Sequence, residues 1–155
     1  MSNQKTLSRG NWPYALSAIS KEKLKRAVEE ICLNWEINPK TIPQNGLGLL
    51  QLKESTLSEN FFLGEFPVSS AYITITLPNG DMVEGASIIM SDDPELAEHL
   101  AICDSVLSAK LSGHEQINEL IQEGLRIREK QQKVRNAMLA STKVDFSLLD
   151  TVEEP

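Results

Sequence analysis

The sequence predicts a single α+β domain, because helical and strand patterns occupy separate stretches of a chain of 155 residues. Apolar residues recur at helical spacing near both ends, whereas β-branched runs and turn residues fill the middle. We therefore expect N-terminal helices (1–40), a small antiparallel sheet of three or four strands (41–91), two C-terminal helices that form a hairpin (92–141) and an extended docking tail (142–155).

The N-terminal part is predicted to contain two helices that end near Trp35. The segment "NWPYALSAIS" has Pro13 close to its start, a position that suits the fixed φ of proline. Ser20 can cap a second helix, in which apolar side chains return at helical spacing. The segment "INPKTIPQNG" then breaks the pattern with two prolines and a glycine.

Strands are expected from Leu47 to Met90. The first, "GLGLLQLKE", precedes "NFFLGEFPV", which Gly64 and Pro67 should interrupt. Phe61 and Phe62 are interpreted as core aromatics, followed by a bulge glycine. The clearest signal is "AYITITLPNGDMVEGASIIM", where two β-branched runs flank an Asn-Gly turn and so predict an antiparallel hairpin.

The first C-terminal helix should begin after an acidic cap, Asp92 or Asp93, with Pro94 in its first turn. It is expected to run to about Leu111 and to be ended by Gly113.

The second C-terminal helix is expected over 114–141, with Gly124 as a possible weak point. A helix of 28 residues extends ~42 Å at ~1.5 Å per residue, whereas a compact chain of this size has a radius of gyration of ~15 Å. The helix should therefore cross a whole face or project beyond it, and it should deliver the tail to the edge of the domain.

Composition and motifs exclude several classes of function. The net charge of -7 argues against general binding to DNA or RNA. Cys32 and Cys103 are far apart, without the spacing of a redox, zinc or iron–sulfur motif, and are expected to be buried free thiols. The sequence has no P-loop, HExxH, GxSxG or dinucleotide fingerprint. Without a signal peptide or a membrane-length apolar run, we expect a cytoplasmic protein that does not associate with membranes.

A carboxylate interrupts the apolar stripe of the first C-terminal helix. Asp104 falls between Leu100 and Leu107, where burying it alone would be too costly. It is either a structural acid held by an arginine or backbone amides, a partner contact, or a catalytic acid that works with His99. His99 and Glu98 are expected toward the exposed edge of this helix.

Two arginines interrupt the stripe of the second C-terminal helix. Arg128 and Arg135 point into its middle and should either form an internal ion pair, with Asp104 as the candidate acid, or contact an acidic partner surface or a nucleotide phosphate. Arg126, Lys130 and Lys133 are expected on a solvated face. The stripe consists of Ile117, Leu120, Ile121, Leu125, Ile127, Val134 and Met138.

The tail carries apolar side chains beyond the last element of its own domain that would cover them: Val144, Phe146, Leu148 and Leu149. A neighbouring subunit covers them, or the tail folds back over its own domain. In the first case Lys143 and Asp145 would set the register at the rim of the interface.

Five ordered segments make the chain resemble the PhnG family, the G subunit of the bacterial phosphonate carbon–phosphorus lyase core complex. They are Arg9 with Trp12, "GLLQL", "FFLGE", "AEHLAICDSVL" and "STKVDF". The chain departs from the family at Ser147, where the family has a second Phe after the Asp of its terminal motif.

The resemblance implies an accessory subunit that assembles with subunits H, I and J. With H, I and L it would be required for transfer of the ribose triphosphate of ATP to a phosphonate with release of adenine, the reaction of ribose 1-methylphosphonate 5-triphosphate synthase. The isolated chain is expected to be inactive and to hold no cofactor, since the iron–sulfur cluster and S-adenosylmethionine belong to subunit J. The alternatives are a general protein-interaction adaptor and a stand-alone enzyme that uses Asp104 and His99.

No catalytic or metal-binding residue is assigned to the chain. Self-association is plausible when partners are missing. Arg128, Arg135 and Lys143 are candidates to supply positive charge near the triphosphate. Partner contacts are predicted at Arg9, Trp12, Asp104, Arg128, Arg135, Lys143, Val144, Asp145, Phe146 and Leu149.

Overall fold

The computed structural model describes residues 7–56 and 58–142. The elements follow in the order η1 (Arg9–Asn11), α1 (Trp12–Leu16), α2 (Lys21–Ile31), β1 (Glu36–Lys53), β2 (Asn60–Thr76), β3 (Met82–Ile89), α3 (Pro94–Ser108) and α4 (His114–Ser141). An α+β architecture with a three-stranded antiparallel sheet is therefore confirmed, and the long C-terminal helix has the predicted bounds.

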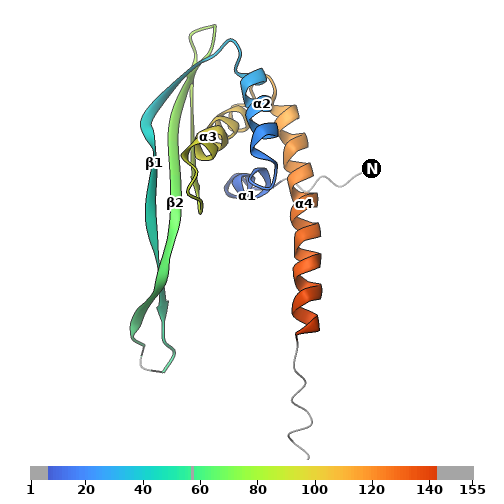
Figure 1. Ribbon diagram of the computed structural model, residues 1–155. Helices are drawn as coiled ribbons and strands as arrows, with labels where there is room; N and C mark the ends of the chain where they lie inside the picture. The colour runs from blue at the N-terminus through green and yellow to red at the C-terminus, as the bar shows by residue number, and fades with distance from the viewer. Residues whose placement is uncertain (1–6, 57, 143–155) are drawn as a thin grey trace, which may run out of the picture.

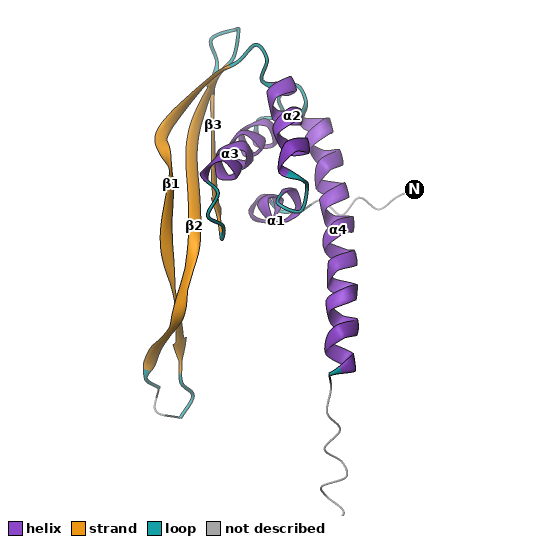
Figure 2. Ribbon diagram, viewed as in Figure 1, coloured by secondary structure: helices purple, strands orange, loops and turns teal. Residues whose placement is uncertain are grey.

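The helices lie on one side of the sheet (Figures 1 and 2). The strands are ordered β1-β2-β3, and both neighbouring pairs are antiparallel. Helix α3 packs against β2 and β3 and also contacts α2 and α4, so it occupies the middle of the molecule. Helix α1 contacts α4 in the outer layer.

The core forms where the sheet meets α3. In β2, burial alternates from Ser69 to Ile75, so that Ile73 and Ile75 point inward and are inaccessible to solvent. They meet Leu100 and Val106 of α3 within one hydrophobic cluster, to which α1, α2 and the first half of α4 also contribute. The outer halves of β1 and β2 make no contribution to it.

The predicted hairpin between β2 and β3 is confirmed. The amide of Gly80 donates to the carbonyl of Leu77 at 2.9 Å, and the amide of Leu77 donates to Asp81 at 2.9 Å. Gly80 has a φ of 88°, a left-handed conformation that glycine adopts without steric cost.

The first strand begins earlier than predicted, at Glu36 instead of Leu47, and it includes Pro39. β1 is an edge strand, so a residue without an N–H is tolerated there. Shifts of register around Thr41 absorb the irregularity. Gly64 and Pro67 do not interrupt β2, which is continuous from Asn60 to Thr76.

The structure confirms one predicted helix cap, at Asp93, and corrects the predictions for Ser20, for the end of α3 and for Gly113. Ser20 stands at the start of α2 but makes no capping hydrogen bond through its side chain. Asp93 does cap α3, accepting from the amide of Leu96 at 3.0 Å. Helix α3 ends at Ser108, and Gly113, with a φ of 89°, precedes the first residue of α4 instead of ending α3.

Within the described ranges 7–56 and 58–142, no helix has the combination of length and apolar character needed to cross a bilayer.

Candidate functional site

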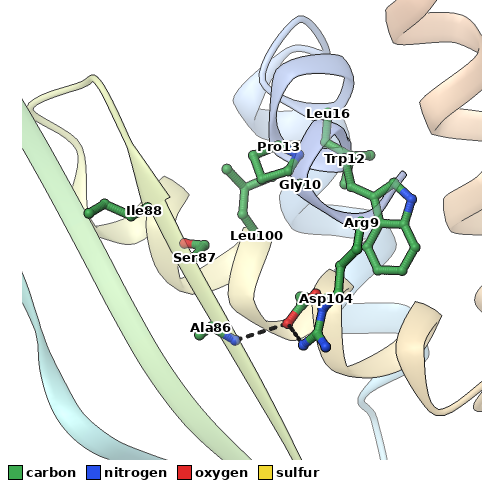
Figure 3. A pocket seen from close by; sticks show the side chains of 10 residues that line it. All are labelled: Arg9, Gly10, Trp12, Pro13, Leu16, Ala86, Ser87, Ile88, Leu100 and Asp104. Carbon is green, nitrogen blue, oxygen red and sulfur yellow. Dashed lines mark hydrogen bonds and ion pairs between the residues drawn. The ribbon is translucent and has the colours of Figure 1, made fainter. Parts of the chain in front are cut away.

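A partly buried ion pair joins the two halves of the chain at Asp104. Arg9 donates from Nε and Nη2 to the two carboxylate oxygens at 2.7 and 2.6 Å, and the amide of Ala86 donates to Oδ2 at 3.1 Å (Figure 3). The Asp104 side chain is 11% exposed and that of Arg9 is 60% exposed, so the arginine reaches in from the surface. This bidentate geometry ties η1 to α3 and β3.

The interpretation of Asp104 as a structural acid held by an arginine and a backbone amide is confirmed. The arginine was assigned wrongly, because Arg9 and not Arg128 or Arg135 is the partner. The pattern on one helix cannot reveal a partner that stands 95 residues away in the sequence. With three donors on its two oxygens, the carboxylate is engaged in holding the fold.

Trp12 stands beside this pair at the start of α1, where its indole N–H donates to the carbonyl of Leu7 at 3.2 Å. A pocket of about 390 Å³ separates η1 and α1 from β3 and α3 (Figure 3). Asp104 and Arg9 supply its charged groups, and the remaining lining is mostly apolar: Trp12, Pro13, Leu16, Ile88 and Leu100 with Gly10, Ala86 and Ser87. This lining offers no second titratable group for acid–base chemistry.

His99 lies in the interior, contrary to the prediction that it is exposed. Only 8% of its surface is accessible, and its Nδ1 atom has no hydrogen-bond partner within residues 7–56 and 58–142. Burial lowers the pKa of this imidazole, and the nearby charges of Glu95 and Glu98 oppose the shift. The reason for the wrong prediction is that α3 is covered by the sheet on one side and by other helices on the other.

His99 and Asp104 do not form a catalytic pair. They are five residues apart on α3, which turns ~100° per residue, so their side chains leave the helix about 140° apart. Asp104 is held by Arg9 and Ala86, so Asp104 and His99 do not have the mutual geometry that a stand-alone enzyme using both would require.

Arg128 fastens α4 to α1. It donates from Nε to the carbonyl of Tyr14 at 3.0 Å and from Nη2 to the hydroxyl of Ser17 at 3.0 Å. Its guanidinium carbon also lies 4.8 Å from the centre of the Tyr14 ring, a cation–π contact. The internal ion pair predicted for Arg128 is not found among the described residues, where its partners are a carbonyl, a hydroxyl, the amide oxygen of Gln131 and a ring. Arg135 is exposed and has no ion-pair partner among the described residues.

Gly124, expected as a weak point of the long helix, is instead a point of close contact. It is buried, and a Cβ atom there would lie 2.0 Å from the carbonyl oxygen of Ala15. The missing side chain lets the backbones of α1 and α4 approach each other.

The outer halves of β1 and β2 form an exposed two-stranded ribbon that we call the β-arm, residues 46–53 and 60–67. It extends past α1, α2 and α3, on the same side of the body as the end of α4 (Figure 1). Large apolar side chains on both of its faces are exposed: Leu47, Leu49, Leu50, Leu52, Phe61, Phe62 and Leu63. An isolated two-stranded ribbon is at best marginally stable in water, and contiguous apolar surface of this kind marks an interaction site.

The β-arm corrects the assignment of Phe61 and Phe62 to the core. Phe61 is 44% exposed and Phe62 is 62% exposed, because no helix reaches this part of the sheet. A bulge lies next to the predicted position: the register shifts between Leu50 and Gln51 and leaves Leu63 without a pairing partner, whereas Gly64 itself pairs with Leu50. Alternating apolar residues in a sequence look the same whether the chain itself or another chain covers them.

The last part of α4, residues 129–142, is the second exposed feature, and we call it the outer segment of α4. Every residue in it is exposed. The apolar stripe predicted along the whole helix is buried only at its beginning, at Ile117, Leu120 and Ile121, whereas Val134 is 48% exposed and Met138 is 65% exposed. Of the two arrangements that its length allowed, the helix takes the second and projects past the body (Figure 2).

The predicted docking residues of the tail, Lys143, Val144, Asp145, Phe146, Leu148 and Leu149, lie outside the described residues. Their role stays a prediction. In the part of the chain that the structure describes, no group of three or more His, Cys, Asp and Glu side chains is placed to hold a metal ion.

A comparison with protein-family models gives a match over most of the chain. A family model described as "Phosphonate metabolism protein PhnG" matches residues 7–150, which is all but the first six and the last five residues. No curated protein matches the sequence significantly. The match includes Arg9, Asp104, the β-arm and the outer segment of α4.

Proposed function

Because this chain belongs to the PhnG family of phosphonate metabolism proteins, we propose that it is an architectural subunit of the carbon–phosphorus lyase complex. Membership of the family gives it a role in phosphonate metabolism. In the proposal it is required, with subunits H, I and L, for transfer of the ribose triphosphate of ATP to a phosphonate with release of adenine. It assembles with subunits H, I and J.

The exposed β-arm is the observation that carries this proposal. Both of its faces are apolar, so a chain that lies on one face alone would leave the other in water. Burying one such side chain is worth roughly 1.5–3 kcal/mol. A partner that encloses the arm therefore gains enough to hold this chain in an assembly, despite the cost of association.

The ionic groups support an architectural role over a catalytic one. Asp104 is held by Arg9 and Ala86, and Arg128 is held by Tyr14 and Ser17, so these groups stabilise the fold. In the proposal the isolated chain has no transferase activity and binds no cofactor of its own. The iron–sulfur cluster and S-adenosylmethionine belong to another subunit.

Two further parts of the proposal concern the location of the protein in the cell and the behaviour of the chain without its partners. Cys32 and Cys103 are both buried free thiols, which suits the reducing cytoplasm. When its partners are missing, the chain is expected to self-associate through the exposed β-arm.

Co-expression with subunits H, I and J tests the architectural role. The variant Leu49→Ser/Phe62→Ser removes two large groups from one face of the β-arm, since Phe62 pairs with Gln51, two residues from Leu49. The control, Leu33→Ser/Met82→Ser, removes two apolar groups elsewhere that are even more exposed than the pair on the arm. We expect the arm variant to recover at least tenfold less of the other subunits and the control to recover normal amounts.

The activity of the same preparations completes the test. Turnover of ATP with methylphosphonate should be absent for the isolated chain and should follow the amount of assembled complex. Turnover by the isolated chain, or normal assembly of the arm variant, would contradict the architectural role.

A further inference from the structure

The outer segment of α4 is a surface for a particular kind of partner. We propose that residues 129–142 pair, as one half of a two-stranded coiled coil, with an acidic amphipathic helix of another subunit. This inference rests on the proposed role as a subunit and adds the chemistry of one partner.

The spacing of residues along α4 supports a helical partner. Positions that alternate by four and three residues line a single seam, as in a coiled coil. They are Leu120, Gly124, Ile127, Gln131, Val134, Met138 and Ser141. The body of the protein buries Leu120 and Gly124 and half-buries Ile127, whereas the positions from Gln131 onward are exposed. The seam therefore continues beyond the body without a covering element in the described chain.

The composition of the exposed seam also suits a helix. Val134 and Met138 provide adjacent apolar positions one turn apart, and both are large enough to insert between side chains of a facing helix. Gln131 is a polar seam residue of the kind that fixes register in coiled coils. A helix that packs here would be continuous with the contact that α4 already makes with α1.

The charges beside the seam specify an acidic partner. The flanking positions that form ion pairs across a coiled coil are Arg128 and Arg135 on one side and Lys130 and Ala137 on the other. None of them is acidic. Neither Lys130 nor Arg135 has an ion-pair partner within 7–56 and 58–142. Glu129, the one acidic residue of the outer segment, lies on the opposite face and pairs with Lys133 at 2.7 Å.

The same charges argue against a second copy of this chain. In a parallel pair, the flanking residue of one helix faces the residue five positions later in the other, so Lys130 would face Arg135 of the second copy. In an antiparallel pair, each flank faces the same flank of the other helix, so Arg135 would approach Arg135 or Arg128 of the second copy. Both arrangements bring like charges together, whereas glutamates on a partner helix would pair with Lys130 and Arg135.

The net charge of the whole chain favours a protein partner over a nucleic acid. The outer segment is basic, but the formal net charge of the chain is -7, so a long polyanion would be repelled by the rest of the molecule. A single helix with a narrow acidic face contacts only the seam.

Charge reversal beside the seam, compared with charge reversal away from it, tests the proposal in the co-expressed complex. The variant Lys130→Glu/Arg135→Glu changes the two flanks of the seam. The control Arg126→Glu/Lys133→Glu changes two exposed basic residues that stand away from it. Each pair takes the formal net charge from -7 to -11, because each of its two substitutions changes the charge by -2. We expect the seam variant to recover at least tenfold less of one subunit and the control to recover normal amounts.

Photo-crosslinking in the wild-type background identifies what lies on the seam. The photoreactive residue p-benzoylphenylalanine is placed at Gln131, on the seam, or at Gln132, one residue further and off the seam. The expected result is a crosslink from Gln131 alone to a helical segment of a co-purified subunit in which Glu and Asp outnumber Lys and Arg. A crosslink to a second copy, to nucleic acid or to a basic segment overturns the proposal, and so does an equal yield from both positions or no crosslink in an intact complex.

The failure of this inference is distinguishable from the failure of the proposed function. If the wild-type chain recovers no other subunit, the proposed function is wrong and the inference fails with it. If the complex assembles with the wild-type chain and equally well with both charge-reversal variants, only the inference is wrong.

Discussion

Replacing Gly124 with alanine separates two opposite expectations about the same helix. From sequence alone, a glycine in a helix interior costs ~1 kcal/mol relative to alanine, so Gly124→Ala should stabilise the protein. In the structure, the added Cβ would lie 2.0 Å from the carbonyl oxygen of Ala15 and 2.7 Å from its carbonyl carbon. Ordinary contact begins at 3.4 Å, so the two backbones have to separate by 1.4 Å at this point.

The magnitude follows from the balance of these two effects. Overpacking a well-packed interior costs ~1–3 kcal/mol, and the upper end applies because the obstacle is backbone and cannot rotate away. After the gain of ~1 kcal/mol in helix propensity, the net destabilisation is ~2 kcal/mol. In a protein of this size each kcal/mol changes Tm by ~2–4 °C, so we expect Tm to fall by ~4–8 °C.

Thermal unfolding followed by circular dichroism measures the effect. The control is Asn136→Ala in the outer segment of α4, where the side chain is exposed and accepts only a surface hydrogen bond from Gln132 at 2.8 Å, so the main change is in helix propensity. Its Tm should stay the same or rise slightly. An unchanged or higher Tm for Gly124→Ala would refute the reasoning, since it would mean that α1 does not rest on α4 at this position.

Three other predictions concern the interior. Arg9→Ala should lower the free energy of unfolding by ~1–2 kcal/mol, because it leaves the mostly buried carboxylate of Asp104 without two charge-assisted hydrogen bonds. Urea unfolding of a double-mutant cycle with Asp104→Ala measures the coupling energy of the pair. A coupling energy below ~0.3 kcal/mol would show that the pair contributes nothing to stability. Burial lowers the pKa of His99, so the unfolded chain binds the proton more readily than the folded one, and stability falls as the pH drops below the unfolded-state pKa of ~6.5. His99→Leu should therefore reduce the loss of Tm between pH 7 and pH 5.5. An unchanged pH dependence of Tm would contradict this. Burial raises the pKa of Cys103 to about 12 and that of Cys32 to about 11. Iodoacetamide at pH 8 should therefore modify these thiols only after unfolding, and mass spectrometry of the native protein should show neither adduct.

The elements with strong local signals were predictable from sequence. The Asn-Gly turn, the cap at Asp93 and the long helix up to Ser141 each depend on residues that are close together in the chain. The start of β1 was missed because Pro39 is a strand breaker by propensity and is tolerated only at the edge of a sheet. Which strand lies at an edge is decided by pairing with distant residues.

The candidate site was predictable only in part, for a related reason. A polar residue on an apolar stripe shows that it requires a partner, and Asp104 has one. The stripe does not show which arginine pairs with Asp104, because Arg9 belongs to another element. His99 was placed at the surface because the pattern of one helix does not reveal that both of its sides are covered.

The exposed apolar surface connects these observations. The body of the protein holds the charges of Asp104 and Arg128 with its own groups, and it packs α1 against α4 so closely that Gly124 carries no side chain. A chain with a finished interior has no folding requirement for apolar residues on both faces of a projecting ribbon, or for a basic helix end in an acidic protein. Since surface of this kind favours association in water, both features support the proposal that other chains cover them.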